Sequence, residues 1–452
     1  MGINNLPASL QSIIQQNFLE REWEDALRAE MGFRAIADRE PFGVGVGETI
    51  TKTRPGLLGA KTTPLAPAAN SDITSGLTSD NYSVEQFTLP INQYADSMLL
   101  NIVTSKVAIQ DQFLLNAKQL AYGARLTLDT LAQQALFSAY LGGNTRVRLT
   151  LGAANVTISV DDIRGFQNTF NSEGQVVPVS VSNPVNVTVG SDVYSLTGAT
   201  ADGSNVSTAP GGISGTLTFS AAVTIADGTA GNSVISAVAP SILRPSTGND
   251  PALSVGNTSL ITSSLANSGR LTLQMLVYAC AQLRANAVPP TEEGLYMLYC
   301  DPFHMTGIYA DPAFQQFFRG RPDTQEYRRG IISDALGLMV VQTNINPIQA
   351  GLGGNGPVHR SILCGQGALI EGEYTTAGYA GDLAGGDDDM ITVIDSIAHV
   401  TREPLDALKQ VVTQSYAYIG GFVAPTDMTA NPTTIPTASN AAFKRAMILE
   451  SL

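Results

Sequence analysis

The longest regular pattern of apolar and polar residues runs from about Thr104 to Leu141. Between Ile109 and Ala139, apolar residues recur at steps of three and four, which aligns them along one side of a helix. Charged residues such as Lys118 and Asp129 fall on the other side, and Gly142-Gly143 ends the pattern. A helix of this length measures about 55 Å at the usual rise per residue. The pattern therefore predicts a long rod that lies across a flat sheet.

Two elements are predicted before this helix. The first is an N-terminal arm over residues 1–47. It begins with an amphipathic helix over residues 7–30 and ends in the sequence GVGVG, which predicts a hinge. Trp23 lies on the apolar side of that helix, and its position has two interpretations. It packs against its own chain, or it anchors the helix on a neighbouring subunit, as aromatic residues do at interfaces.

The second element, over residues 48–85, is an extended loop. A stretch that starts at Glu48 and another that starts at Ser83 alternate in polarity like strands, and a long irregular segment separates them. A two-stranded arm does not bury both of its faces, so it needs another surface to lie on. Lys52, Arg54 and Lys61 are among the few cations of this region. We expect these three side chains to be assembly contacts that meet acidic groups on a neighbouring subunit.

The composition changes sharply after residues 86–143, which hold the returning strand and the long helix. Residues 144–268 are rich in Gly, Ser, Thr, Val and Asn, and segments such as VPVSVSNPVNVTV alternate with period two. No Lys, Arg, His or Cys occurs between Gly165 and Leu243. The pattern predicts an inserted β-sandwich-like domain. We expect residues 145–267 to fold alone and the rest of the chain to stay folded without them.

The remaining chain predicts helices and strands that alternate. Residues 269–388 begin with the helical stretch SGRLTLQMLVYACAQLRANAV and continue with the buried strand LYMLYC. Residues 389–424 contain alternating stretches that predict closing strands, and residues 425–452, rich in Thr and Pro, are interpreted as a C-terminal tail. Taken together, the elements indicate an α+β fold.

Composition and charge exclude several classes of protein. The chain has 452 residues with 44% hydrophobic and 14% charged residues, which provides material for packed cores and is unlike a disordered protein. The net charge of −14 and the lack of a basic run argue against a free-standing reader of DNA sequence. The start lacks a secretory signal, no apolar stretch has the length of a membrane span, and the three scattered cysteines indicate reduced thiols.

Known signatures of catalysis and metal binding give no site. The GLGGNG stretch at 351–356 follows a turn and precedes a strand, whereas a dinucleotide site needs a strand before it and a helix after it. Asp387–Asp389 lack the ligand spacing of a calcium loop and are interpreted as a solvated loop. His304, His359 and His399 have no evident nucleophile or acid partner. We therefore expect a structural protein with no catalytic, cofactor-binding or metal-binding residues.

The order of these elements resembles the major capsid proteins of tailed bacteriophages with the Hong Kong 97-type fold, and within them the N-four-like coliphage capsid family. The matching stretches are GETITKTRPGLL and FTLPINQYADSMLL in the loop, LNAKQLAYGARLTLDTLAQQAL in the long helix, SGRLTLQMLVYACAQLRANAVPP, YMLYCDPFHM and DPAFQQFF after the insertion, and REPLDALKQVVTQSYAYIGGFV near the end. The resemblance implies an N-arm (1–47), an extended loop (48–85), a peripheral domain with the spine helix (86–143), an axial domain (269–388) and closing peripheral strands (389–424). It leaves residues 144–268 as an insertion.

The resemblance also implies a function. It implies a capsid protein that self-assembles into hexamers and pentamers of an icosahedral head, assembled in the host bacterial cytoplasm. The implied partners are a portal protein, a decoration protein and a separate scaffolding protein, because the residues before Gly43 are few for a built-in scaffold. Packaged double-stranded DNA would touch the inner face without sequence preference, and neither a cofactor nor a membrane is implied.

Two other structural roles remain open. An encapsulin-like nanocompartment shell shares this fold by resemblance, although such shells usually lack a large β insert. A surface-layer or adhesin protein would carry a Thr- and Ser-rich β domain, but it should also have a secretion signal. If the protein is a capsid protein, we expect the acidic insert to face outward, because a surface that faces the phosphates of packaged DNA favours Lys and Arg. We also expect no covalent cross-linking, since Lys61 is the only cation near the loop tip.

Overall fold

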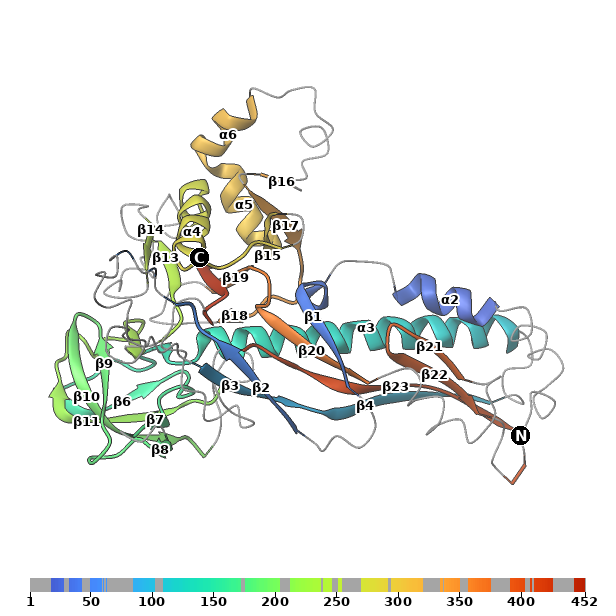
Figure 1. The fold of residues 1–452 in the computed structure, drawn as a ribbon, viewed down its shortest axis with the longest axis horizontal. Helices are drawn as coiled ribbons and strands as arrows, with labels where there is room; N and C mark the ends of the chain where they lie inside the picture. Colours follow the sequence, from blue (N-terminus) through green and yellow to red (C-terminus); the bar gives the residue numbers. More distant parts are fainter. Residues whose placement is uncertain are drawn as a thin grey trace, which may run out of the picture.

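The structure is a computed structural model with a long helix, two main sheets and a separate β barrel (Figure 1). The part of the chain that it describes comprises residues 18–27, 32–42, 49–58, 60, 62, 84–101, 109–171, 175–203, 212–236, 239–245, 251–253, 270–291, 294–319, 334–335, 337–349, 357–374, 391–402, 407–408, 410–425 and 443–451. Helices and strands are both present in quantity, which confirms the α+β class.

The helix α3 (Ile109–Leu141) has 33 residues and confirms the predicted rod. Its apolar side is buried, with Phe113 and Ala124 at 0% exposure. The helix extends along sheet A, described next (Figure 1). The expected start at Thr104 lies outside the described residues. The chain leaves the helix through Gly143, whose φ of 74° is a conformation that glycine adopts without strain.

Sheet A carries α3 on one face and joins segments that are far apart in the sequence. Its six strands follow the order β1 (Ala37–Phe42), β20 (Leu369–Tyr374), β23 (Val411–Val423), β22 (Ile397–Arg402) and β21 (Ile391–Ile394), and β4 (Asn92–Asn101) also pairs with β23. β22 and β4 both pair with residues 413–418 of β23, so they flank its opposite edges. β1 runs parallel to β20, and the other pairs are antiparallel.

The second sheet has eight strands and packs against helices. Its order is β14 (Pro251–Leu253), β13 (Ile242–Pro245), β24 (Ala446–Ser451), β19 (Val358–Cys364), β15 (Tyr296–Cys300), β17 (Leu338–Gln342) and β16 (Asp334–Ala335), with β18 (Ile348–Gln349) on β19. The helices are α4 (Leu273–Ala285), α5 (Pro302–Ala310) and α6 (Pro312–Arg319). Thr272 and Asp301 cap α4 and α5 by accepting a backbone N–H three residues on. Side chains of α4, β15 and β24 meet in one buried cluster.

The two-stranded arm is confirmed by β2 (Thr49–Pro55) and β3 (Val84–Pro90), which pair antiparallel. Phe87 is 4% exposed and Leu89 is 1% exposed, so part of β3 is already covered by its own chain. A Cβ on Gly372 of sheet A would lie 2.4 Å from the Leu89 side chain, which shows how closely β3 approaches the sheet. The surface that the arm needs is therefore provided in part by the same subunit.

Residues after the long helix form a β barrel in place of the expected β-sandwich. One six-stranded sheet has the order β5 (Asn144–Arg146), β12 (Ser233–Ser236), β9 (Val185–Val189), β10 (Asp192–Ala201), β11 (Gly215–Val223) and β6 (Asn155–Val160), and β7 (Asn168–Phe170) pairs with β8 (Val176–Pro178). A bridge between Val147 and Val160 joins the two ends of the six-stranded sheet. A closed sheet buries its inner face without a second sheet, and its buried residues form a cluster of their own.

Three expected boundaries differ from the strand pairing. Strands β13 and β14 fall within the expected insertion but belong to the second sheet, where β13 pairs with β24. The expected tail contains β24, all of whose residues are buried between β13 and β19. Strand β20 falls within the expected axial domain but pairs with β1 and β23 of sheet A. Local composition misled in each case, because a short strand is placed by partners that are distant in the sequence.

Candidate assembly surfaces

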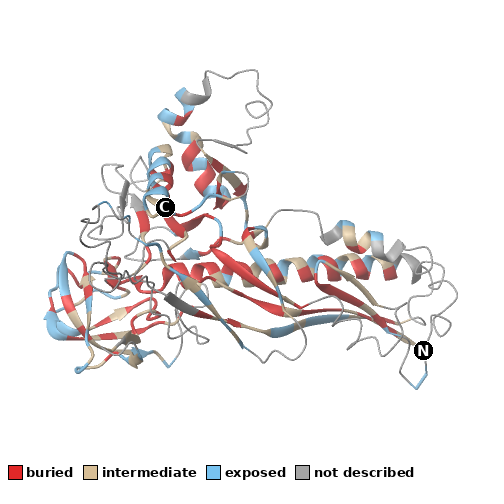
Figure 2. Ribbon diagram, in the orientation of Figure 1, coloured by how far each residue is buried: buried red, intermediate tan, exposed pale blue. Residues whose placement is uncertain are grey.

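The N-terminal segment folds back on its own chain, as Figure 2 shows by the buried residues beneath it. It consists of α2 (Phe18–Leu27), the 3-10 helix η2 (Phe33–Ile36) and β1. Trp23 is 0% exposed, and its ring lies 4.6 Å from the ring of His399 on β22. Glu22 forms an ion pair of 2.6 Å with Lys118 of α3. The first interpretation of Trp23 is therefore correct, and the expectation that it anchors a neighbouring subunit is wrong, because its ring is fully enclosed.

Arg34 ties this segment to sheet A. Its guanidinium lies 2.8 Å from a carboxylate oxygen of Glu371 and 2.5 Å from one of Asp395. Glu371 is 0% exposed and also accepts a hydrogen bond of 2.9 Å from the Tyr418 hydroxyl. Burial is the largest single effect and lowers the pKa of Arg34, but the charge and hydrogen bond of Glu371 together with the charge of Asp395 outweigh it, so the pKa lies above its ordinary value. Arg34 is thus paired with a buried carboxylate of sheet A, which holds the segment in one position.

The carboxylate of Asp395 is held in place by a tight turn between β21 and β22. Asp395 and Ser396 have φ angles of 54° and 64°, a pair of left-handed conformations typical of a two-residue hairpin turn. Such turns favour Asn and Gly, so the Asp-Ser pair is a local departure from the usual residues. Asp395 forms ion pairs with both Arg34 and Arg39. The turn therefore positions one carboxylate between two guanidinium groups of the N-terminal segment.

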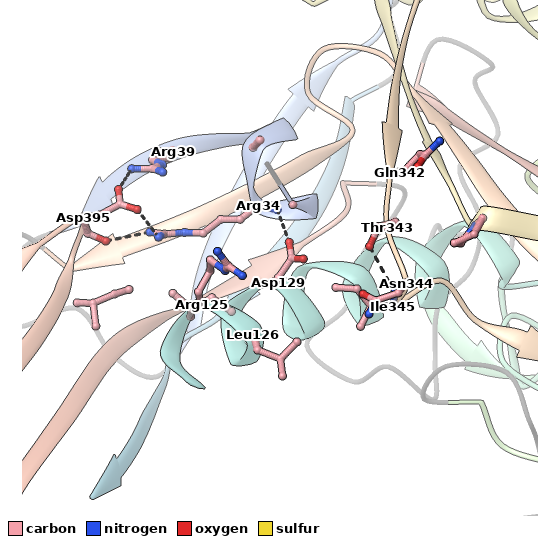
Figure 3. A pocket seen from close by; sticks show the side chains of 15 residues that line it. Arg34, Arg39, Arg125, Leu126, Asp129, Gln342, Thr343, Asn344, Ile345 and Asp395 are labelled. Carbon is pink, nitrogen blue, oxygen red and sulfur yellow. Dashed lines mark hydrogen bonds and ion pairs between the residues drawn. The ribbon is translucent and has the colours of Figure 1, made fainter. Parts of the chain in front are cut away.

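A cavity of about 500 Å³ opens beside this cluster (Figure 3). Its lining includes charged and amide side chains from η2, β1, α3, the end of β17 with the residues after it, and the β21–β22 turn: Arg34, Arg39, Arg125, Asp129, Asp395, Gln342 and Asn344. Asp129 accepts the Arg34 backbone N–H at 3.1 Å, and burial raises the pKa of its carboxyl. Both charge signs and amides line the cavity, so its lining offers hydrogen-bond donors and acceptors.

Two of the three histidines have partners that sequence reasoning did not find. His359 contacts the carboxylate of Asp301, and His304 contacts the hydroxyl of Ser361, 57 residues away. Ser361 is 0% exposed and His304 is 1% exposed. Burial lowers the pKa of His304 to about 4. A hydroxyl enclosed in this way does not meet a substrate, so the geometry favours a structural network over a nucleophile.

A second buried cluster links the barrel to the second sheet. Glu450 of β24 forms ion pairs with Arg146 of β5 and with Arg360 of β19, the latter at 3.0 Å. The exposed fractions of the three side chains are 1%, 3% and 5%. Arg146 and Glu450 are 304 residues apart, and no local sequence signal connects them. The barrel is therefore anchored to the C-terminal strand by charge pairing as well as by its chain connections.

The cations expected on the arm also have partners within the chain. Lys52 forms an ion pair with Glu40 of β1. Arg54 donates hydrogen bonds of 3.0 Å and 3.2 Å to the carbonyl oxygens of Gly367 and Pro425. Lys61 lies outside the described residues. The structure thus brings Lys52 and Arg54 to their own sheet, and their role as contacts to a neighbouring subunit stays a prediction.

Large apolar side chains are exposed on α3 and on the arm. Leu115, Tyr122 and Leu126 of α3 are 54%, 43% and 56% exposed and lie on one side of the helix at steps of seven and four. Leu57 and Leu58, just after β2, are 63% and 59% exposed.

Within the described residues, no cluster of three or more His, Cys, Asp or Glu side chains is placed to hold a metal ion. None of the helices in the described part has the length and apolarity needed to cross a membrane.

Comparison with known proteins gives structural matches but no sequence family. No protein-family profile matches the chain, and no curated protein matches it. The capsid of Ralstonia phage GP4 matches at 11% identity and a TM-score of 0.46, over 92% of this chain and 87% of that chain. The capsid of the cyanophage P-SCSP1u matches at 11% identity and a TM-score of 0.45, over 94% and 89%. The capsid asymmetric unit of the cyanophage Pam1 matches at 13% identity and a TM-score of 0.47, over 91% and 88%. These similar structures are phage capsids, and with TM-scores below 0.5 the case for a function comes from this chain's own geometry.

Proposed function

We propose that this chain is a structural capsid protein of the tailed-phage kind, with the Hong Kong 97-type fold, and that it builds a closed shell from copies of itself. One observation carries the proposal. The 33-residue helix α3 lies along sheet A, after a two-stranded arm and strand β4 and before a barrel and a second sheet. Apart from the barrel, this order is the one implied by the sequence resemblance. That this chain belongs to the N-four-like coliphage capsid family stays a prediction.

Exposed apolar side chains support assembly from many copies. Leu57 and Leu58 on the arm are open in a single subunit, and so are Leu115, Tyr122 and Leu126 on the exposed side of α3. Large apolar patches on a soluble chain usually mark interfaces. Repeated head-to-tail contacts close into rings when the rotation between copies is a whole fraction of a turn. We propose hexamers and pentamers of this kind, and a structural rather than an enzymatic role.

The proposed partners follow from the capsid role. They are further copies of the chain, a portal protein, a separate scaffolding protein, a decoration protein, and double-stranded DNA inside a virion assembled in the bacterial cytoplasm. The barrel is proposed to face outward. No basic residue occurs between Gly165 and Leu243, and the three arginines of the barrel before this stretch (Arg146, Arg148 and Arg164) are each paired with an acidic side chain, so the barrel has little attraction for DNA phosphates.

A nanocompartment shell is the second candidate, because it would use the same helix, arm and sheets. The barrel favours a virus, since it adds a self-contained β domain that a small cargo shell does not need. Electron microscopy of the protein expressed with its scaffold tests both candidates. Closed shells that form only with the scaffold support the capsid, whereas closed shells that form without a scaffold and carry protein cargo support the nanocompartment. Sheets or monomers alone would contradict both.

Charge reversal on the arm tests how the shell is joined. Changing Lys52 and Arg54 to Glu is expected to give soluble capsomers that fail to close, because the new carboxylates would repel the acidic groups that the two cations are proposed to meet on a neighbour. The exchange Glu40→Lys with Lys52→Glu restores the pair within the subunit. Recovery of shells by that exchange would show that Lys52 acts inside its own chain. The matched control is Arg148→Glu, which reverses a paired cation in the barrel and should leave assembly intact.

A further inference from the structure

Among the described residues, strand β4 leaves one edge of sheet A without a partner strand. β4 has ten residues, and within the described part of the chain it pairs with β23 only. Figure 1 shows it along the margin of the sheet, on the side away from β22 and β21. An open edge presents a row of backbone N–H and C=O groups that can pair with another strand.

The other margins of sheet A are protected in ways that β4 is not. β1 carries three charged residues and a proline: Asp38, Arg39, Glu40 and Pro41. β21 is only four residues long. Charge, proline and short length are the usual means by which proteins blunt an edge. β4 is long, has no Lys, Arg or Pro, and has Asp96 as its single charged residue.

In the middle of β4, one backbone N–H group donates its hydrogen bond to a side chain of the same strand instead of to a neighbouring strand. The Ser97 backbone N–H donates to the Asp96 carboxylate at 2.8 Å. Around it the strand is open to solvent: Ala95 and Ser97 are exposed, and Leu99 is 68% exposed. These three residues alternate along the strand and therefore lie on the same face of the sheet. That face combines small residues at its centre with one large apolar side chain.

We propose that β4 pairs antiparallel with β4 of a second copy of this chain across a two-fold axis, so that sheet A continues from one subunit into the next. An interface of this kind closes on itself because both copies use the same surface. The pairing itself does not depend on the proposed function; only its occurrence within a shell rests on that function. It requires two copies and no scaffold, DNA or decoration protein.

The side chains select the register of this pairing. A two-fold axis places one residue opposite itself, and residues directly opposite share a face. With Asp96 on the axis, like charges would be opposed, which is destabilising. With Ser97 on the axis, two small side chains meet at the centre and Ala95 lies opposite Leu99 of the other copy. Since Ser97 is next to the middle of the strand, this register also pairs nearly its whole length.

A cysteine at position 97 tests the proposal. Opposite residues of an antiparallel pair have Cα atoms about 4.5–5.5 Å apart, which is within the range of a disulfide. Ser97→Cys should therefore give a dimer on non-reducing electrophoresis after mild oxidation with glutathione disulfide. The control is Gln93→Cys, because the two copies of residue 93 would be about 27 Å apart along the strands. The native cysteines at 280, 300 and 364 are buried and do not compete.

A second pair of variants checks the register and the edge. Ala95→Cys with Leu99→Cys should cross-link, whereas either change alone should not. Ala95→Lys with Leu99→Lys should blunt the edge and reduce the Ser97→Cys dimer at least tenfold. If Ser97→Cys stays monomeric in assembled shells, or if Gln93→Cys cross-links equally well, the pairing is refuted while the proposed function stands. If the protein forms the Ser97 dimer but never a shell, the pairing stands and the proposed function fails.

Discussion

The buried pairing between Glu450 and two arginines makes a quantitative prediction about how the barrel is attached. Glu450→Gln removes the one carboxylate and leaves Arg146 and Arg360 as buried cations without a counter-charge from that side chain. Removing one partner of a buried ion pair destabilises a protein by about 3–5 kcal/mol. Arg146→Met should be milder, because it leaves the pair between Glu450 and Arg360 in place. The expected order of destabilisation is therefore Glu450→Gln above Arg146→Met.

Two controls separate this effect from a general loss of packing. The triple change Glu450→Leu, Arg146→Met and Arg360→Met replaces all three charges by apolar groups and should be neutral or stabilising, because it also removes the desolvation penalty. Asp202→Asn breaks the half-exposed pair with Arg148 inside the barrel, where an ion pair is worth less than about 1 kcal/mol.

Urea unfolding of the unassembled protein provides the measurement. Far-ultraviolet circular dichroism follows the whole chain, and the fluorescence of the single, buried Trp23 follows the region of α2 and sheet A. Limited proteolysis should release the barrel earlier in Glu450→Gln than in the wild type. A Glu450→Gln midpoint within the range of Asp202→Asn would refute the reasoning, and so would a triple variant as unstable as Glu450→Gln.

Three further predictions address acid stability, the domain boundary and cross-linking. Burial lowers the pKa of His304 and of His399 to about 4, so the unfolded chain takes up protons before the folded one as the pH falls. Stability should be unaffected by these groups above pH ~6.5 and should fall between pH ~6.5 and ~4, by up to about 3 kcal/mol for each histidine. Urea midpoints measured across this range provide the check, and the midpoint of His399→Leu should change less steeply with pH. An unchanged wild-type midpoint at pH 4.5 would contradict the prediction. Replacing residues 144–236 by a short Gly/Ser linker should leave a folded, soluble chain, whereas the longer deletion of 145–267 also removes β13 and should aggregate. If the two deletion variants had the same thermal melt, a barrel boundary at residue 236 would be contradicted. Mature particles should run as monomers on a denaturing gel, and a ladder of multiples would show covalent cross-linking.

The local elements followed from the sequence because their signals are local. The repeat of apolar residues at steps of three and four gave α3, since that spacing buries one side of a helix whatever lies beneath it. Alternation gave the arm strands β2 and β3. The Asp301-Pro302 pair marks the start of α5, where Asp301 caps the helix. In each case, residues within a few positions of one another determine the outcome.

Only the tertiary structure decided which strands pair and which polar residues meet. AMILES near the C-terminus reads like the end of a tail, yet it is an interior strand because β13 and β19 supply its hydrogen bonds. Trp23 fits a docking helix or an internal one equally well until sheet A is seen to enclose it. The contacts of Glu450 with Arg146 and Arg360 join residues hundreds of positions apart or on separate strands. Strand pairing and buried charge depend on long-range contacts, and a pattern read along a single chain carries no information about which distant partner completes them.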